Sequence, residues 1–90
     1  MKDKLYIKTR LENIASERVP QETKMQQKHE ERLKILTWIY NLGNLRTEEE
    51  MNIQLQNTNE ELMSYQLAGI TGILVEYAKI RKDELENIIN

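Results

Sequence analysis

Residues 59–88 read NEELMSYQLAGITGILVEYAKIRKDELENI and carry the strongest helical pattern in the chain. At about 100° per residue, the apolar side chains of this stretch fall on one broad face. That face is formed by Leu62, Met63, Leu67, Ile70, Ile73, Leu74, Tyr77, Ile80 and Ile88. The pattern predicts a long central helix over residues 59–88.

Three small residues lie on the other side of this predicted helix: Ala68, Gly69 and Gly72. Each glycine inside a helix costs about 1 kcal/mol relative to alanine, so two within four residues need a reason. Close approach of another helix backbone would supply one. We therefore expect these three residues to pack against a neighbouring helix, and residues 68–75 to be buried on two sides.

Other residues mark the ends of further helices. Pro20 suits the first turn of a helix, and Gly43 before Asn44 is typical of a C-terminal cap. Thr47 followed by Glu50 forms a capping box, and Thr58 followed by Glu61 repeats it. These signals predict helices at about 2–18, 20–42, 48–56 and 59–88, the third of them short.

The composition fits one all-α domain over residues 1–90, a small bundle of three long helices and one short one. Only two valines, no phenylalanine and no Asn-Gly or Asp-Gly pair argue against strands. With no cysteine, the chain has no disulfide, thiolate zinc site, iron–sulfur cluster or cysteine nucleophile. Thirteen basic and 15 acidic residues nearly cancel, giving a formal charge of −2. Such a balance provides no overall attraction to nucleic acid or to an anionic membrane.

The amino-acid composition also indicates where the protein is located and what kind of organism it comes from. No stretch approaches the roughly 18–20 apolar residues that span a bilayer, and no apolar run follows the first residues, so we expect no signal peptide and a cytoplasmic location. Lys, Ile and Asn fill 26 positions, whereas Ala, Gly and Pro fill only 7. Because the codons of the first set are rich in A and T, we expect a low-GC bacterium or its phage as the source.

No set of residues predicts catalysis, a cofactor or a metal site. His29 precedes two glutamates, but four residues later stands Leu33, where a zinc-binding helix would need a second histidine. We therefore expect His29 at a solvated helix position. Glu76 lies between apolar residues, and we expect it to pair with a Lys or Arg. An enzyme would need Glu76 or His29 to converge with another polar group, and we expect no small-molecule substrate.

The N-terminal third supplies an alternative. Residues 1–34 carry nine basic and six acidic groups, including Lys2, Lys4, Lys8 and Arg10. Clustered cations can bind phosphates, so a dimer of this chain could be a DNA-associated transcriptional regulator. The acidic residues among them and the acidic pI of about 5.5 favour a solvated helix instead.

The favoured hypothesis is a non-enzymatic accessory or regulatory protein that acts by protein–protein interaction. Residues 20–32 have only Met25 to bury, and such helices are often held by a partner. We expect partner contacts at Met25, His29, Arg32, Trp38 and Tyr40, since aromatic and arginine side chains are enriched in interfaces. A 90-residue chain buries only about 60–65% of its unfolded surface, so a homodimer is favoured over a monomer.

Overall fold

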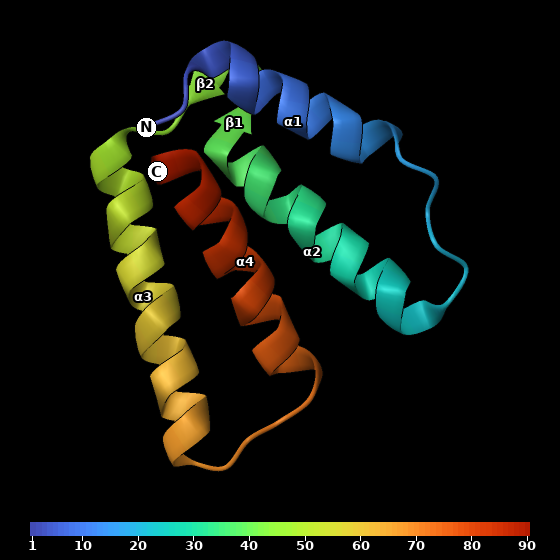
Figure 1. Ribbon diagram of the computed structural model, residues 1–90, viewed down its shortest axis with the longest axis vertical. Helices are drawn as coiled ribbons and strands as arrows, with labels where there is room; N and C mark the ends of the chain where they lie inside the picture. Colours follow the sequence, from blue (N-terminus) through green and yellow to red (C-terminus); the bar gives the residue numbers. More distant parts are fainter.

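A computed structural model describes all 90 residues and shows four helices and one small hairpin (Figure 1). The helices are α1 (Lys4–Ser16), α2 (Thr23–Ile39), α3 (Glu48–Leu67) and α4 (Ile73–Ile89). Between α2 and α3, strands β1 (Tyr40–Asn41) and β2 (Asn44–Leu45) pair antiparallel. The predicted all-α bundle is confirmed, and the hairpin is an addition to it.

Helix α4 lies in the middle, with α2 along one side and α3 along the other (Figure 1). Helices α3 and α4 run antiparallel as a helical hairpin, and α1 runs antiparallel to α2. The molecule measures 39 × 35 × 18 Å. Since one helix with its side chains is about 10–12 Å across, the short dimension holds at most two layers. Most helices therefore keep one side open to solvent.

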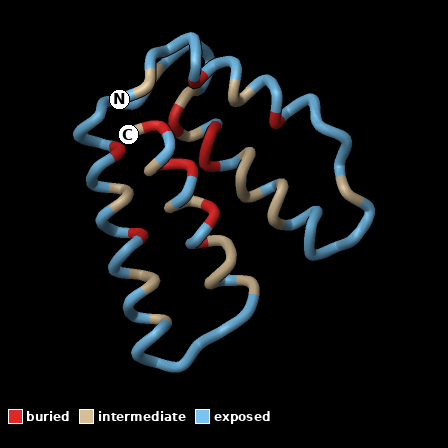
Figure 2. The backbone as a smooth tube through the Cα atoms, in the orientation of Figure 1, coloured by how far each residue is buried: buried red, intermediate tan, exposed pale blue.

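The buried core lies at the end of the molecule where both termini meet (Figure 2). All four helices contribute to it, because one side of α1, the end of α2, the start of α3 and the end of α4 pack together there. Its members are Ile7, Ile14, Ile35, Leu36, Ile39, Met51, Leu85 and Ile88. At the opposite end no residue from 59 to 77 is buried. The predicted two-sided burial of residues 68–75 is therefore wrong.

Two of the helices begin with satisfied caps. The Asp3 carboxylate accepts the Tyr6 N–H at 2.8 Å, at the start of α1. At the start of α3 the Thr47 hydroxyl accepts the Glu50 N–H at 3.1 Å, and the Glu50 carboxylate accepts the Thr47 N–H at 3.3 Å. The predicted capping box at Thr47 is confirmed, and it fixes where α3 starts.

The predicted central helix over 59–88 is wrong, and so is the short helix over 48–56. Helix α3 continues without a break through Thr58, whose hydroxyl donates to the Gln54 carbonyl at 2.8 Å instead of capping a new helix. The chain then turns at Gly69 and Gly72, which have φ of +69° and +107°. Neither glycine packs against a helix, since a Cβ built on either would meet nothing within 4 Å. Ala68, the C-cap of α3, is exposed.

The predicted helices at 2–18 and 20–42 are confirmed in type and corrected at their ends. Helix α2 starts at Thr23, three residues after Pro20, and ends at Ile39. Gly43 is not a helix cap, because Asn41 pairs with Asn44 across a two-residue turn. Its two central residues, Leu42 and Gly43, have φ of +50° and +83°. Two positive φ values in succession are the backbone of a type I′ hairpin turn.

Candidate functional site

Glu84 is the buried charged residue that joins α1, α2 and α4. Its side chain is 5% exposed, and its carboxylate accepts two hydrogen bonds from the Arg10 guanidinium, at 2.6 and 3.3 Å. The Arg32 Nε lies 3.1 Å from the same carboxylate but is not aligned for a hydrogen bond. The hydrogen bond to Glu84 raises the pKa of Arg10, although partial burial opposes this. Because it contacts two guanidinium groups, Glu84 links α4 to both α1 and α2 through ion pairs; we call such a link a tie.

Arg81 forms a second tie, between α2, α3 and α4. Its guanidinium donates to Glu31 of α2 at 2.8 Å and to Glu61 of α3 at 2.5 Å. The Tyr65 hydroxyl donates to the same Glu61 carboxylate at 2.7 Å, and this hydrogen bond raises the pKa of Tyr65. Arg81, Glu31 and Glu61 border a groove of about 460 Å³ between α2 and α3. Its charged groups are largely engaged with one another.

The polar start of α2 is explained by contacts within the chain. Lys28 lies 3.5 Å from Glu76, which confirms the expectation that Glu76 pairs with a cation. The expectation of a solvated His29 is wrong, because its side chain is 10% exposed and lies 3.9 Å from the Glu17 carboxylate. No group of three His, Cys, Asp or Glu side chains converges as metal ligands would. Met25, half exposed, is the apolar residue of this segment that stays open to solvent.

The predicted aromatic contact residues pack inside the molecule. Trp38 and Tyr40 are half-buried against the core. The Arg46 guanidinium lies 4.8 Å from the Trp38 ring centre, and the Lys4 ammonium lies 5.9 Å from the Tyr40 ring centre. Such cation–π contacts stabilise the junction of α1, the hairpin and α3. The binding of a partner by these two residues and by Met25, His29 and Arg32 stays a prediction.

The N-terminal cations are spread over different contacts. Lys2 lies over the Tyr6 ring at 5.7 Å, Lys8 pairs with Glu12 at 3.9 Å, and Arg10 is bound to Glu84. A phosphate-binding surface needs cations that are free and point the same way. Each of these three cations instead lies next to a group of the same chain.

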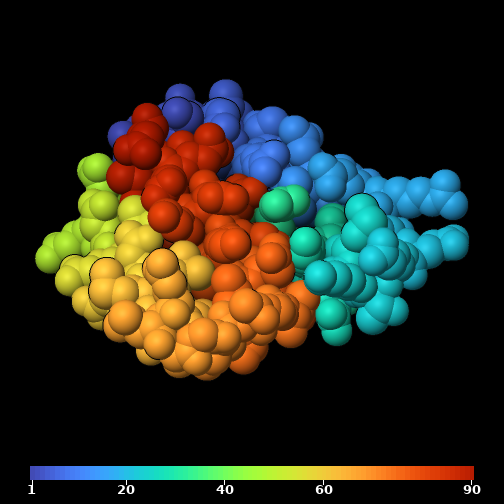
Figure 3. All heavy atoms as spheres, turned by 60° about the horizontal axis from the view of Figure 1, so that its bottom comes forward, coloured from blue at the N-terminus to red at the C-terminus, as the bar shows by residue number.

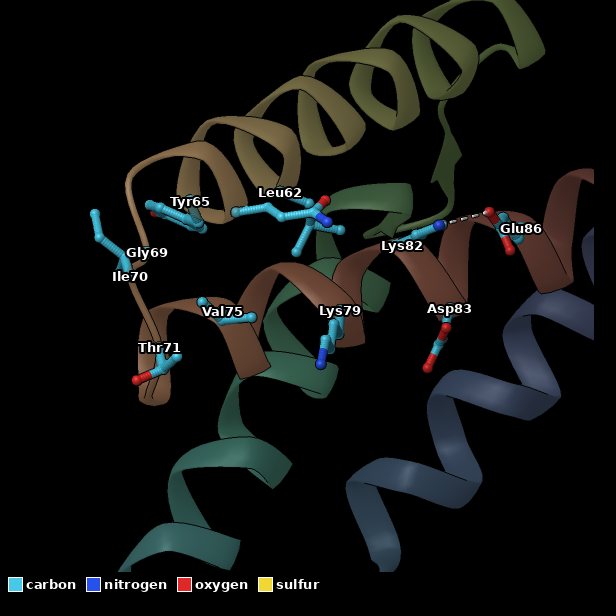
Figure 4. A pocket seen from close by; sticks show the side chains of 11 residues that line it. Leu62, Tyr65, Gly69, Ile70, Thr71, Val75, Lys79, Lys82, Asp83 and Glu86 are labelled. Atoms are coloured by element: carbon cyan, nitrogen blue, oxygen red, sulfur yellow. Dashed lines mark ion pairs between the residues drawn. The ribbon is translucent and has the colours of Figure 1, made fainter.

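A groove of about 630 Å³ lies along one side of the α3–α4 hairpin (Figure 4). Its apolar walls come from Leu62 and Tyr65 of α3, Ile70 of the connection and Val75 of α4. Four charged residues of α4 line the same groove: Lys79, Lys82, Asp83 and Glu86. Met63 precedes the groove residue Gln66 by three positions and so lies on the same flank of α3. We call this surface, from Leu62 to Gln66 with Ile70, Val75 and the four charged residues, the α3–α4 face.

Exposed apolar side chains gather at the same end of the hairpin. Met63 is 63% exposed, Leu67 83%, Ile70 43% and Leu74 53%. Figure 3 brings this end forward and shows the end of α3, the connection and the start of α4 as one continuous surface. The sequence pattern predicted that all four residues lie on the buried apolar face of one helix. Their apolar character was visible in the sequence, but the lack of a covering element was not.

None of the four helices has both the length and the apolar composition that crossing a bilayer requires. Comparisons of the chain with protein-family models, with curated proteins and with solved structures found no match.

Proposed function

We propose that this protein acts without catalysis, by protein–protein interaction through the α3–α4 face. The observation that carries the proposal is a set of exposed apolar side chains at the connected end of the hairpin. Met63 and Ile70 belong to the face, and Leu67 and Leu74 are the neighbours in sequence of its residues Gln66 and Val75. Single exposed apolar residues are common, but a contiguous group marks a surface that another molecule covers.

The open shape of the molecule supports the same proposal. Its accessible surface is 6062 Å², whereas a compact monomer of 10.8 kDa exposes about 5,500 Å². Its radius of gyration is 13.5 Å, against about 12 Å for a compact chain of this length. The excess surface belongs to a fold whose core occupies one end. Association would bury part of the other end.

The alternative, a DNA-associated regulator built on the N-terminal third, has less support. Arg10 is held by the buried Glu84, and Lys8 forms an exposed pair with Glu12. Phosphates would have to compete with these contacts for the same cations. The α3–α4 face needs no rearrangement before a partner can bind it.

Site-specific photo-crosslinking tests the proposal. A benzophenone amino acid is placed at Met63, within the face, and in a control variant at Leu5, which is 72% exposed on α1. Each variant is irradiated both as purified protein and in extract of the source cell. We expect a discrete protein adduct at position 63 that excess unlabelled protein suppresses, and none at position 5. Equal adducts at both positions, or none at position 63, would overturn the proposal.

A further inference from the structure

We propose that the partner of the α3–α4 face is a second copy of this chain, bound through a two-fold axis with the two α4 helices antiparallel. This inference rests on the proposed function and adds the identity of the partner. Three features of the face support it: the order of charges along α4, the uncharged flank of α3, and the size of the surface.

The charges of α4 on this face are divided by sign. Lys79 and Lys82 lie in the half nearer the start of the helix, and Asp83 and Glu86 lie in the half nearer its end. The one ion pair among them within the chain is Lys82 to Glu86, at 3.9 Å between partly exposed side chains. Lys79 and Asp83 are exposed, form no ion pair, and extend from the same side of α4 (Figure 4). Lys79 and Asp83 stand one helical turn apart but form no close ion pair, so both charges are accessible to a partner.

A two-fold pair requires a surface that complements itself, so that each contact occurs twice. With antiparallel α4 helices and the axis between Lys82 and Asp83, the basic half of one helix lies over the acidic half of the other. Lys79 of each copy then stands opposite Glu86 of its partner. A parallel pair would instead place lysine against lysine and acid against acid, which disfavours that arrangement.

The flank of α3 adds no charge to the face. Gln66 lines the groove, and Met63 and Asn59 precede it by three and seven residues, positions that share one side of a helix. The face as a whole is therefore neutral, with two positive and two negative groups. The chain carries only −2, so two copies repel each other little as they approach. In this register Val75 of one copy would face Asn90 of the other, so the pair covers the groove along α4, and the exposed apolar residues of the α3–α4 connection lie at the edge of the interface.

The size of the overlap fits a weak, transient dimer. With the axis between Lys82 and Asp83, residues 76–89 of the two α4 helices overlap, which is about 21 Å of helix, and two adjacent helices are about 20 Å wide. Each copy would contribute about 400 Å², or about 800 Å² for the pair, which lies in the range of transient interfaces. We expect a reversible dimer whose affinity depends on salt.

Charge reversal followed by mixing tests the proposal. One double variant, Lys79→Glu with Lys82→Glu, makes the α4 side acidic throughout, and a second, Asp83→Lys with Glu86→Lys, makes it basic throughout. The matched control, Arg18→Glu with Lys24→Glu, changes the net charge as the first variant does but lies away from the face. Sedimentation equilibrium is measured on each over about 1 µM to about 1 mM, with circular dichroism to verify helix content.

We expect the parent and the control to dimerise and each face variant to dissociate at least about tenfold more readily. An equimolar mixture of the two face variants should form a heterodimer, seen as the mixed mass in native mass spectrometry. Raising NaCl from about 0.1 M to about 1 M, which shortens the Debye length from about 10 Å to about 3 Å, should weaken the parent dimer.

Three outcomes would overturn the symmetric pair: a parent that stays monomeric at all concentrations, face variants that dimerise as well as the parent, or a mixture that does not associate. A monomeric parent that still crosslinks another protein at position 63 would refute only the identity of the partner. A monomeric parent without such an adduct would refute the proposed function as well.

Discussion

Replacing Glu84 with glutamine should destabilise the protein more than any other change of a single charged residue. The substitution keeps the shape of the side chain but removes the charge that faces Arg10 and Arg32. It also weakens the main polar contact between α1 and α4. The other polar side-chain contact between these helices is a hydrogen bond from Asn87 to the Tyr6 hydroxyl at 3.0 Å.

The expected loss follows from the number and exposure of the arginine contacts. Each interaction with a charged partner contributes about 1.5–3 kcal/mol. Because the Arg10 side chain is 36% exposed, the lower value applies to each of its two hydrogen bonds with Glu84, which gives about 3 kcal/mol. Glutamine still offers one acceptor oxygen and should recover about 1 kcal/mol of this. A net loss of about 2 kcal/mol corresponds to a fall in Tm of about 8–16 °C for a domain of this size.

Urea unfolding followed by circular dichroism at neutral pH measures the loss directly. The control is Glu12→Gln, which breaks the exposed pair with Lys8 and should cost less than about 0.5 kcal/mol. Arg10→Met and its double variant with Glu84→Gln complete a cycle, in which the two losses should not add. If Glu84→Gln unfolds within about 0.5 kcal/mol of the parent, or if the cycle is additive, Glu84 does not tie α1 to α4.

Three further outcomes are expected. Gly72→Ala and Gly72→Leu should destabilise the protein by similar amounts, about 1–3 kcal/mol in urea unfolding, because the cost lies in the backbone at φ +107° and not in lack of space. A much larger loss for leucine would indicate packing. The Thr47 backbone N–H lowers the pKa of Glu50, so its contribution is present above the ordinary carboxyl range and is lost as pH falls through the lowered value; the difference between parent and Glu50→Gln, measured by urea unfolding at several pH values, should shrink on acidification. The Tyr65 phenol should ionise at higher pH than a free tyrosine, and Glu61→Gln should lower its pKa in an ultraviolet absorbance titration compared against Tyr65→Phe.

Periodicity and capping predicted the helical class and the start of α3, because both depend on residues close in sequence. The capping box at Thr47 needs only the residues from 47 to 50. Burial depends on which other element reaches a helix face, and periodicity does not contain that information. Leu67 and Leu74 have the spacing of core residues but are 83% and 53% exposed. Figure 2 shows that the connected end of the α3–α4 hairpin is exposed. The candidate face was therefore missed even though its apolar residues were recognised.

The charged ties could not be predicted for a related reason. Arg10 and Glu84 are 74 positions apart, and Arg81 reaches Glu31 across 50. Each of these residues also fits a solvated helix surface, where most charged residues lie. The polar start of α2 was interpreted as a segment that needs a partner. In the structure α4 supplies the ion-pair partners of this segment, because Glu84, Glu76 and Arg81 all pair with residues of α2.

The glycines show how a correct local inference can support the wrong topology. Both Gly43 and Gly69 have positive φ, which glycine favours, but the sequence pattern assigned a helix cap to the first and helix packing to the second. Gly69 is the capping glycine: its N–H donates to the Gln66 carbonyl, and the Ile70 N–H donates to the Tyr65 carbonyl at 2.9 Å, which together form a Schellman motif. That motif usually brings an apolar contact between the residues at the Tyr65 and Ile70 positions, and both line the groove. The pattern of an apolar residue four positions before a glycine and a second apolar residue directly after it, as in Tyr65, Gly69 and Ile70, therefore indicates the end of a helix. Because that helix end is also where the exposed apolar residues gather, the same motif that stops α3 creates the α3–α4 face.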